Sequence, residues 1–568
     1  MSLTCGLKLT HDGSVALFDG ARCVFSVEVE KLDNAPRYSP VADLELVPRL
    51  LADFDCKPGD VDQWVVDGWD GHGSADIGTA SSGQPVGLTV AGYRELDDDP
   101  DLLRPGWHGE LALPGRPVPY VSYPHLAGHV AAAYCASPFA AAGEPALVLA
   151  WDGGTFPRLY SAWPAGRVDS HGALFPLIGH AYATSAHHFG PYRREDEALT
   201  VDDLSVAGKL MAYIALGTPR DEIQAVAGET YRRHFGGDGA QAAAHRARIG
   251  GWGSNAEPSL RYLHAFFRDV RARLAGLGAS DDDVLASFHQ FVEDLLVDRL
   301  TRAVRERHGA GPHNLCFVGG CALNIKWNSA LRRQPEFADV WVPPFPNDSG
   351  SAFGAAAAHL MATTGTSAVD WTVRMGPELR AGGVLRDGWS AAACTPEQLG
   401  ARLHATGEPV VLLDGRAEVG PRALGGRSIV AAPTDPATKD LLNDVKLREP
   451  YRPVAPICLV DDAPAVFDPG RPDPYMLFDH RVRPEWTDRI PAVLHLDGTA
   501  RLQTVGPEEP TLTRVLGAYK RASGIPVLCN TSANFHGRGF FPDVDSAMEW
   551  GRIGAVWSEG TLFTREAA

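Results

Sequence analysis

Two histidines and two aspartates of this sequence have the types and spacing of a metal site. His125 and His129 stand four residues apart in a helix-like stretch, so both imidazoles would lie on one face as neighbouring ligands. Asp152 and Asp348 each begin a glycine-containing turn. This mixed nitrogen and oxygen set suits Fe(II), Mn(II) or Zn(II) better than Ca²⁺. The alternatives are a polar helix face for the histidines and turn or helix-cap roles for the aspartates.

Glycine-rich and arginine-rich segments indicate binding of anions. Gly319 and Gly320 follow a β-prone run and open the sequence GGCALN, which ends at Asn324. Glycines there would let a nucleoside or its phosphates approach main-chain N–H groups, although a tight turn is the commoner use. Residues 416–428 hold three arginines and one glutamate among glycines, and more basic residues follow in 443–453. This local positive excess predicts anionic ligands, with a solvated charged loop as the alternative.

A strand near the C-terminus ends in neutral polar side chains. Residues 525–534, with the sequence IPVLCNTSAN, read as a buried strand followed by a run of hydroxyl and amide groups. Such a run can bind phosphate or a carboxamide through neutral hydrogen bonds.

Composition limits the class of protein. The 568 residues are 45% hydrophobic and 21% charged, which is typical of a globular protein and excludes disorder and collagen. A net charge of −18 disfavours a surface that binds the phosphate backbone of a nucleic acid, so no nucleic-acid partner is expected. The nine cysteines form no CxxC pair and read as reduced. No export signal or membrane span is visible, which predicts a cytoplasmic protein without a membrane partner.

The elements that would position these residues follow one pattern twice. Short β-prone runs joined by acidic-glycine turns occur at 6–20 and again at 146–163. The pattern of strands followed by helices occurs twice. It predicts an α/β protein with a duplicated actin-like (ribonuclease H-like) N-terminal domain that binds a nucleotide between its two halves. The expected helices are 42–54, 124–136, 282–308 and 350–363.

A composition shift marks the expected domain boundary. We expect a first domain over residues 1–363, a connector over 364–395 and a second α/β domain over 396–568. The second domain should begin with a helix near Thr395, followed by a strand at 409–413.

Taken together, the motifs resemble the NodU/CmcH-type O-carbamoyltransferases. As an ordered set reaching from His11 to about Phe540 they are highly specific. One departure is EVEKLDNAPRYS at 28–39, whose form looks closer to the cephem-antibiotic branch than to the nodulation branch. The matching motifs are the HxxxH pair, GKLM (208–211), GGCALN, NDSG, GPRALGGRS, REPYRPVAP (448–456), HLDGTARLQT (495–504) and LCNTSAN.

The resemblance implies a TsaD-like, actin-like N-terminal domain and a YrdC-like C-terminal domain. The YrdC-like domain would use carbamoyl phosphate and ATP, with Mg²⁺, to make carbamoyl adenylate. The TsaD-like domain would then transfer the carbamoyl group to a hydroxyl of a small natural product, an antibiotic such as a cephem or an aminoglycoside.

The resemblance also assigns residues. The family's metal ligands match His125, His129, Asp152 and Asp348, with iron the usual metal. His11, in a His-Asp-Gly turn, would assist the acceptor hydroxyl, although a histidine beside Asp-Gly often only completes a turn. Arg452 and Ser532 are expected to act in catalysis with it. The expected nucleotide- and carbamoyl-phosphate-binding residues are Gly208, Lys209, Gly319, Gly320, Asn324, Arg422, Lys446, Arg501 and Asn530.

Two other functions fit parts of the sequence. A tRNA threonylcarbamoyl transferase could combine the same two folds. To bind tRNA, however, the protein would need a basic surface, which its net charge of −18 does not favour. A nucleotide-gated interaction protein of the actin-like class would explain GGCALN, but it leaves the histidine and aspartate set and the arginine-rich segments without a role.

Overall fold

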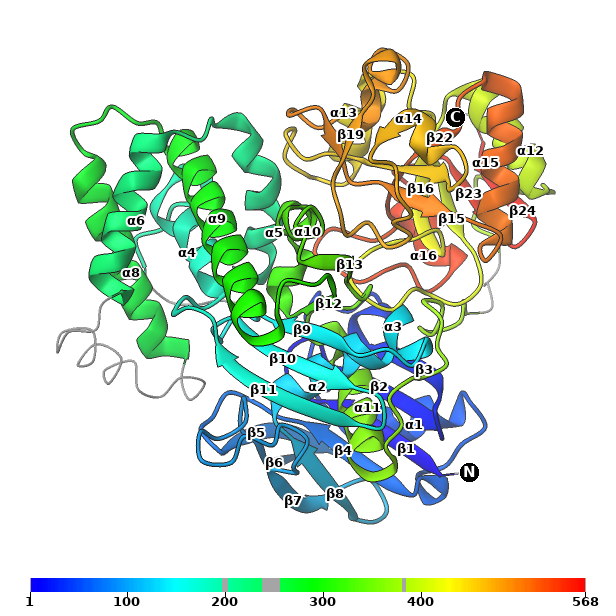
Figure 1. Ribbon diagram of the computed structural model, residues 1–568. Coiled ribbons are helices and arrows are strands. Elements are labelled where there is room, and N and C mark those ends of the chain that lie inside the picture. The colour runs from blue at the N-terminus through cyan, green and yellow to red at the C-terminus, as the bar shows by residue number, and fades with distance from the viewer. Residues whose placement is uncertain (1, 197–202, 237–255, 381–384, 567–568) are drawn as a thin grey trace. The chain divides into compact units, whose positions relative to one another are not determined.

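A computed structural model describes residues 2–196, 203–236, 256–380 and 385–566. Internal contacts divide the chain into two units, one of residues 1–24 with 40–371 and one of residues 25–39 with 372–568 (Figure 1). Within the described ranges no helix is long and apolar enough to cross a membrane. The nine cysteines, which all lie in those ranges, are free thiols.

The first unit contains two mixed β-sheets, of which the first has the strand order β3-β2-β1-β4-β8-β7. In this sheet β1 pairs antiparallel with β2 and parallel with β4, and β4 pairs parallel with β8. A separate hairpin, β5-β6, is also antiparallel. The bounds are β1 (Leu3–Lys8), β2 (Ser14–Asp19), β3 (Arg22–Glu28), β4 (Gln63–Asp67), β5 (Ser74–Ser81), β6 (Gln84–Ala91), β7 (Trp107–Leu111) and β8 (Val118–Tyr123).

The second sheet repeats this pairing in the order β11-β10-β9-β12-β13. Strand β9 pairs antiparallel with β10 and parallel with β12, and β12 pairs parallel with β13. All five residues of β9 are buried, as expected for a strand covered on both faces. The predicted strand runs at 6–20 and 146–163 are confirmed. The bounds are β9 (Ala146–Ala150), β10 (Arg158–Trp163), β11 (Arg167–Ala173), β12 (His313–Val318) and β13 (Phe337–Trp341).

Two alanine-rich helices, α2 (His125–Cys135) and α11 (Ser351–Thr364), pack against each other. Helix α11 also packs on β1, β2 and β4 of the first sheet, whereas α2 packs on β9 and β12 of the second. Their close approach requires glycine, because a Cβ added at Gly354 would lie 2.0 Å from the backbone oxygen of Gly128. The pair therefore joins the two sheets, and it places the start of each helix near the ends of the strands.

A group of helices follows the second sheet's meander (Figure 1). Helix α6 packs on α8 and α9, and α4 packs on α5 and α8. The four helices predicted from the sequence correspond to α1, α2, α9 and α11, and their existence is confirmed. The remaining bounds of this unit are α1 (Leu46–Ala52), α3 (Pro138–Ala141), α4 (His180–His188), α5 (Asp203–Tyr213), α6 (Asp221–Phe235), α8 (Ala256–Leu274), α9 (Asp281–His308) and α10 (Ile325–Arg332).

The second unit is built on an eight-stranded mixed sheet with the order β14-β24-β23-β15-β16-β22-β17-β21. Its first helix, α12, begins as expected after Thr395, whose side chain caps the helix in a capping box with Gln398. Strand β14, however, lies inside the segment expected to be a connector. Helices α12 and α15 pack together beside a core that includes Leu403 and Val515.

The elements of the second unit have the following bounds. They are β14 (Trp389–Ala393), α12 (Pro396–Thr406), β15 (Val410–Leu413), β16 (Arg427–Ala431), α13 (Ala437–Val445), β17 (Ala455–Leu459), α14 (Ala463–Val466), β18 (Phe467–Asp468), β19 (His480–Val482), β20 (Thr499–Ala500), β21 (Gln503–Val505), α15 (Pro510–Ser523), β22 (Val527–Ser532), α16 (Val544–Trp550), β23 (Ala555–Ser558) and β24 (Thr561–Arg565).

Residues 25–39 belong to the second unit although they are early in the sequence. The backbone N–H of Arg37 donates to the carbonyl of Gly537 over 3.0 Å. The buried Lys31 ammonium contacts Glu28 at 2.8 Å and donates to the carbonyl of Glu418 over 2.6 Å. These long-range bonds differ from the expected division, which placed the whole of residues 1–363 in one domain, because hydrophobic pattern does not reveal which later segment a strand end will pair with.

Candidate functional site

Four of the predicted residues meet in the first unit. One ligand atom from each of His125, His129, Asp152 and Asp348 lies within 4.8 Å of the others. The Nε2 atoms of the two histidines are 3.1 Å apart, and each is 3.4 Å from Oδ1 of Asp348. The histidines come from the first two turns of α2, Asp152 lies two residues after the end of β9, and Asp348 precedes α11. The arrangement is a possible metal-binding cluster of the predicted composition.

Two residues that the sequence did not single out orient these ligands. Nδ1 of His125 lies 2.8 Å from Oδ2 of Asp67, at the end of β4, which leaves Nε2 directed toward the cluster. Lys8, at the end of β1, contacts Oδ2 of Asp67 at 3.0 Å and Oδ2 of Asp348 at 2.8 Å. Although burial opposes its charge, the carboxylates of Asp348 and Asp67 raise the pKa of Lys8. Lys8 therefore supplies a positive charge among the buried carboxylates.

Both oxygens of the Asp152 carboxylate accept hydrogen bonds. The main-chain N–H of Gly320 donates to Oδ1 over 2.7 Å, and the hydroxyl of Tyr93 donates to Oδ2. Burial, together with the charge of Asp152, raises the pKa of Tyr93 well above its usual value, so the phenol keeps its proton. Gly320, expected to bind a nucleotide, thus lies against a candidate metal ligand.

His11 lies at the edge of the same cluster. Its Nδ1 is 2.9 Å from Oδ2 of Asp12 and its Nε2 is 3.7 Å from Oδ2 of Asp348. Its side chain is 31% exposed, so the ring is reachable by a ligand. Trp69 packs against it edge-on, with ring centroids 5.2 Å apart. Although burial opposes protonation, Asp348 and Asp12 raise the pKa of His11.

The other residues expected to bind a nucleotide have different surroundings. Gly319 follows β12 with a φ of +92°, and a Cβ there would lie 2.3 Å from the backbone oxygen of Trp151. Asn324 caps α10, because its Oδ1 accepts from two backbone N–H groups of that helix. Gly208 and Lys209 lie on α5, where Lys209 lines a cavity of about 480 Å³ with Arg193 and Arg194.

The second unit holds a cluster of cationic side chains, which we call the cation cluster. Burial and the neighbouring positive charges together lower the pKa of Arg422, Lys446, Arg448 and Arg501. Because guanidinium groups stay charged in proteins, bringing several of them together favours the binding of an anion. The cluster consists of Arg37, Arg422, Lys446, Arg448, Arg452 and Arg501.

The cation cluster is held at the end of β22. Lys446 donates to the carbonyl of Ser532 over 2.7 Å. Arg448 donates to the hydroxyls of Thr531 and Ser532 over 2.7 Å and 3.3 Å. Asn530 donates from Nδ2 to Gln503, while its buried Oδ1 has no hydrogen-bond partner among the described residues. The Nε atoms of Arg422 and Arg501 are likewise buried without a partner in the described chain. These orphaned groups are where a bound ligand could form hydrogen bonds.

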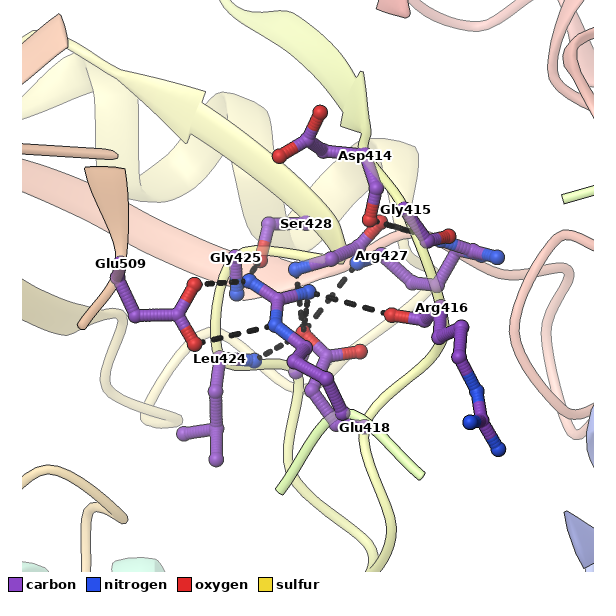
Figure 2. Close-up of polar contacts among 12 residues, drawn as sticks. Asp414, Gly415, Arg416, Glu418, Leu424, Gly425, Arg427, Ser428 and Glu509 are labelled. Atoms are coloured by element: carbon purple, nitrogen blue, oxygen red, sulfur yellow. Dashed lines mark hydrogen bonds and ion pairs between the residues drawn. The ribbon is translucent and has the colours of Figure 1, made fainter. Parts of the chain in front are cut away.

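Two of the three arginines in 416–428 are not in this cluster. Arg416 donates to the carbonyls of Met375 and Gly376, and the buried Arg427 donates to those of Gly415 and Gly426. Figure 2 shows the buried Glu418 carboxylate beside Arg427, accepting from the backbone N–H groups of residues 424, 426 and 427. Of the three arginines, only Arg422 was assigned to ligand binding, and the other two donate to loop carbonyls that would otherwise be buried without donors.

Sequence reasoning missed several residues of these sites, among them Lys8, Asp67, Arg37 and Arg448, as well as Tyr93. Asp67 carried a usable signal, since it ends a β-prone run and stands before glycine, as Asp152 does. Arg448 lies within the REPYRPVAP motif and could have been included with Arg452. Lys8 and Arg37 gave no comparable signal, because only the pairing of distant segments brings them to the sites.

Comparison with known proteins covers both units. The model of the carbamoyltransferase N-terminus matches residues 3–81 and 115–357, and that of the carbamoyltransferase C-terminus matches residues 401–554. The chain is 52% identical over 569 residues to nodulation protein U of Rhizobium tropici, covering 99% of this chain and 96% of that protein. It is 50% identical over 565 residues to nodulation protein U of Sinorhizobium fredii, covering 99% of each. It is 33% identical over 600 residues to the 3'-hydroxymethylcephem-O-carbamoyltransferase of Streptomyces clavuligerus, covering 100% of this chain and 99% of that protein.

These identities correct the expected branch. The form of residues 28–39 suggested the cephem-antibiotic branch, but over the whole chain identity to nodulation protein U is 52% against 33% for the cephem enzyme. The segment was a poor guide to the branch because twelve residues weigh little against identity measured over the whole chain.

The matches to the N-terminal and C-terminal models together include more than half of the residues, in the same order along the chain. The relatives align over nearly their full length, so the correspondence is not limited to a shared fold element. The chain belongs to the carbamoyltransferase family and is a carbamoyl-transferring enzyme.

Proposed function

We propose that this enzyme uses ATP and carbamoyl phosphate to carbamoylate a hydroxyl group of a natural product. The observation that carries the proposal is the cation cluster with its orphaned groups at the end of β22. Carbamoyl phosphate and ATP bring several negative charges together, and guanidinium groups both bind them and stabilise charge as phosphates depart.

The cation cluster is suited to forming carbamoyl adenylate. Carbamoyl phosphate is hydrolysed to carbamate and phosphate, and a carbamate oxygen then attacks the α-phosphorus of ATP, which expels pyrophosphate. Arg422, Arg452 and Arg501 bind the phosphate groups, with Lys446 and Ser532 at the edge of the pocket they form. The buried Oδ1 of Asn530, which needs a donor, accepts a hydrogen bond from the carbamoyl NH₂ group.

The metal cluster of the first unit is suited to the transfer step. Its two imidazoles and two carboxylates within 4.8 Å fit a divalent transition metal, and Asp67 fixes His125 with Nε2 directed inward. His125, His129, Asp152 and Asp348 would hold the ion, for which we propose Fe(II). A metal bound there supplies Lewis-acid stabilisation of nucleotide phosphate charge. Gly319 and Gly320 would contact the nucleotide through their lack of a side chain, because their N–H groups already donate to the carbonyl of Pro346 and to Oδ1 of Asp152.

His11 acts on the acceptor. The acceptor oxygen attacks the carbonyl carbon of carbamoyl adenylate, AMP leaves with the bonding electrons, and Nε2 of His11 takes the hydroxyl proton. Asp12, at 2.9 Å from Nδ1, holds the ring with Nε2 directed toward the cluster. The partial exposure of His11 leaves its ring accessible, so that the acceptor hydroxyl can approach Nε2.

We also propose an acceptor class and a fold for each unit. One relative is named for O-carbamoylation of a hydroxymethylcephem and others as nodulation proteins, which supports a hydroxyl of a small natural product as acceptor. The repeated strand pattern of the two sheets, with α2 and α11 packed together, supports an actin-like duplication in the first unit. For the second unit we propose the YrdC-like fold, with domains near the predicted 1–363 and 396–568 but with residues 25–39 joined to the second.

Release of pyrophosphate from ATP, dependent on carbamoyl phosphate, is the direct test. Purified protein should release pyrophosphate without an acceptor, and the Arg452→Ala and Ser532→Ala variants should lose this activity. The same variants should still transfer the carbamoyl group from supplied carbamoyl adenylate. Equal loss of both reactions in folded variants would show that the two reactions do not use separate sites. No release by the wild-type protein would exclude the adenylate route.

A further inference from the structure

Tyr93 lies in a part of the chain that the family model does not match. The N-terminal model matches residues 3–81 and resumes at residue 115, so 82–114 fall outside it. Tyr93 lies two residues after the end of the hairpin strand β6 and is only 5% exposed. The segment nevertheless reaches the metal cluster rather than remaining on the surface.

The segment closes the N-terminal end of α2, the helix that bears both histidines. Helix α2 has Pro124 at its N-cap position and no side-chain cap, so its first N–H groups need other acceptors. The carbonyl of Gly92 accepts from the N–H of His125 over 3.1 Å, and that of Tyr93 accepts from Leu126 over 2.9 Å. Residues 92 and 93 therefore fix the residue at which the helix begins. They thereby also fix the position of His125 along the helix axis.

The Tyr93 side chain contacts two of the four candidate ligands. Its hydroxyl donates to Oδ2 of Asp152, and its ring packs edge-on against that of His125 with centroids 4.9 Å apart. Gly320 donates to Oδ1 of the same carboxylate, so the two donors together fix its rotation. An ionised carboxylate has about four lone-pair sites, so it can accept both bonds and still bind a cation.

We propose that Tyr93 is a positioning residue of the metal site, which orients Asp152 and His125 for the ion. The inference rests on the metal part of the proposed function, namely that these four residues bind a divalent ion. It assigns a role in the site to residues 82–114, outside the part matched by the family model. Partners of metal ligands are commonly worth about 10- to 100-fold in metal affinity.

The test is the Tyr93→Phe variant, which removes the hydroxyl and keeps the ring. Metal-free protein is titrated with Fe(II) under anaerobic conditions and with Co(II), whose visible absorption reports the geometry of its ligands. We expect Tyr93→Phe to bind both ions about 10- to 100-fold more weakly than wild type and to show a changed Co(II) spectrum. Circular dichroism and the melting temperature of the metal-free protein check that the variant is folded.

Tyr120→Phe is the matched control. Tyr120 also donates its hydroxyl within this region, to the carbonyl of Thr89 over 2.5 Å, but it does not contact a candidate ligand through that bond. The control should lower the melting temperature and leave metal affinity and the Co(II) spectrum unchanged. Wild-type affinity and spectrum in Tyr93→Phe, or equal changes in both variants, would overturn the inference. Absence of binding by the wild-type protein would instead refute the proposed metal site itself.

Discussion

Oδ2 of Asp348 lies 2.8 Å from the Nζ atom of Lys8, while Oδ1 of the same carboxylate faces the two histidines at 3.4 Å. The two oxygens thus have separate partners, a fixed cation on one side and the candidate metal position on the other. Lys8 and Asp348 are both buried, with 1% and 5% of their side chains exposed. The pair keeps the carboxylate charged before any metal binds.

Replacing Lys8 should make the protein depend more on metal. Lys8→Met leaves two buried carboxylates without their cation, and breaking a buried pair typically costs about 3–5 kcal/mol of unfolding free energy. A divalent ion restores part of the lost charge, so the metal should raise the melting temperature of the variant more than that of wild type. Thermal unfolding with and without Fe(II) or Zn(II) measures this, with Lys57→Met at an exposed position as the control. An equal metal-induced shift in variant and wild type would count against the role of Lys8.

Removing both histidines should abolish metal binding and transfer together. In the His125→Ala, His129→Ala double variant only two carboxylates remain, and these alone do not make the mixed ligand set. Metal content measured by elemental analysis should fall to background, and transfer from supplied carbamoyl adenylate should be lost. Pyrophosphate release should continue. Full metal occupancy in this variant, with His108→Ala as an exposed control, would refute the ligand assignment.

Arg448, which sequence reasoning missed, should matter for the first half-reaction. It donates to Thr531 and Ser532 and contributes charge to the cation cluster. Arg448→Ala should slow pyrophosphate release by about 10²-fold or more, because one stabilising donor is lost where charge develops. Transfer from supplied carbamoyl adenylate should be little changed. The control is Arg471→Ala, at an exposed position. A wild-type rate of pyrophosphate release in Arg448→Ala would show that Arg448 does not contribute to this half-reaction.

His11→Asn tests the proposed base. General-base assistance is typically worth about 10²- to 10⁴-fold, so transfer to the hydroxyl should slow by a factor in that range. Asparagine keeps the ability to complete the turn, which separates catalysis from local structure. The rate is measured in single-turnover experiments with carbamoyl adenylate and acceptor, and adenylate synthesis in the same variant is the internal control. Carbamoylation at the wild-type rate would show that His11 has only a structural role in the turn.

Glu418 should make the stability of the second unit depend on pH. Although burial opposes its ionisation, Arg374 and backbone N–H groups hold the pKa of this carboxyl below its ordinary value of about 4.5. Its stabilising contribution is therefore fully present above pH 4.5 and is lost as the pH falls through the depressed folded-state pKa.

The Glu418→Gln variant should accordingly melt well below wild type at pH 7, and the difference should narrow as the pH falls below about 4.5. Melting curves at several pH values measure this. Glu397→Gln, which removes the carboxylate of an exposed pair with Arg514, should change the melting temperature little at any pH. A gap between Glu418→Gln and wild type that does not vary with pH would mean that the carboxylate charge is not what stabilises the loop.

The sequence by itself determined the local elements and the four candidate metal ligands. Alternating and periodic hydrophobic residues gave the two strand meanders and helices α1, α2, α9 and α11, because these patterns depend only on residues near each other in the chain. The spacing of His125 and His129 placed both on one turn of helix, and the acidic-glycine turns supplied Asp152 and Asp348. All four meet in the structure.

Only the tertiary structure decided which distant residues join those sites. Lys8 and Asp67 reach the metal cluster because β1 and β4 are neighbours in one sheet, and Arg37 reaches the cation cluster because residues 25–39 pair with a loop some 500 residues later. The three arginines of 416–428 look alike in sequence, yet Arg422 faces the other cations whereas Arg427 binds loop carbonyls. The function of a buried charged side chain depends on the groups that contact it. Those contacts depend on packing between segments far apart in the chain, which local sequence patterns do not encode.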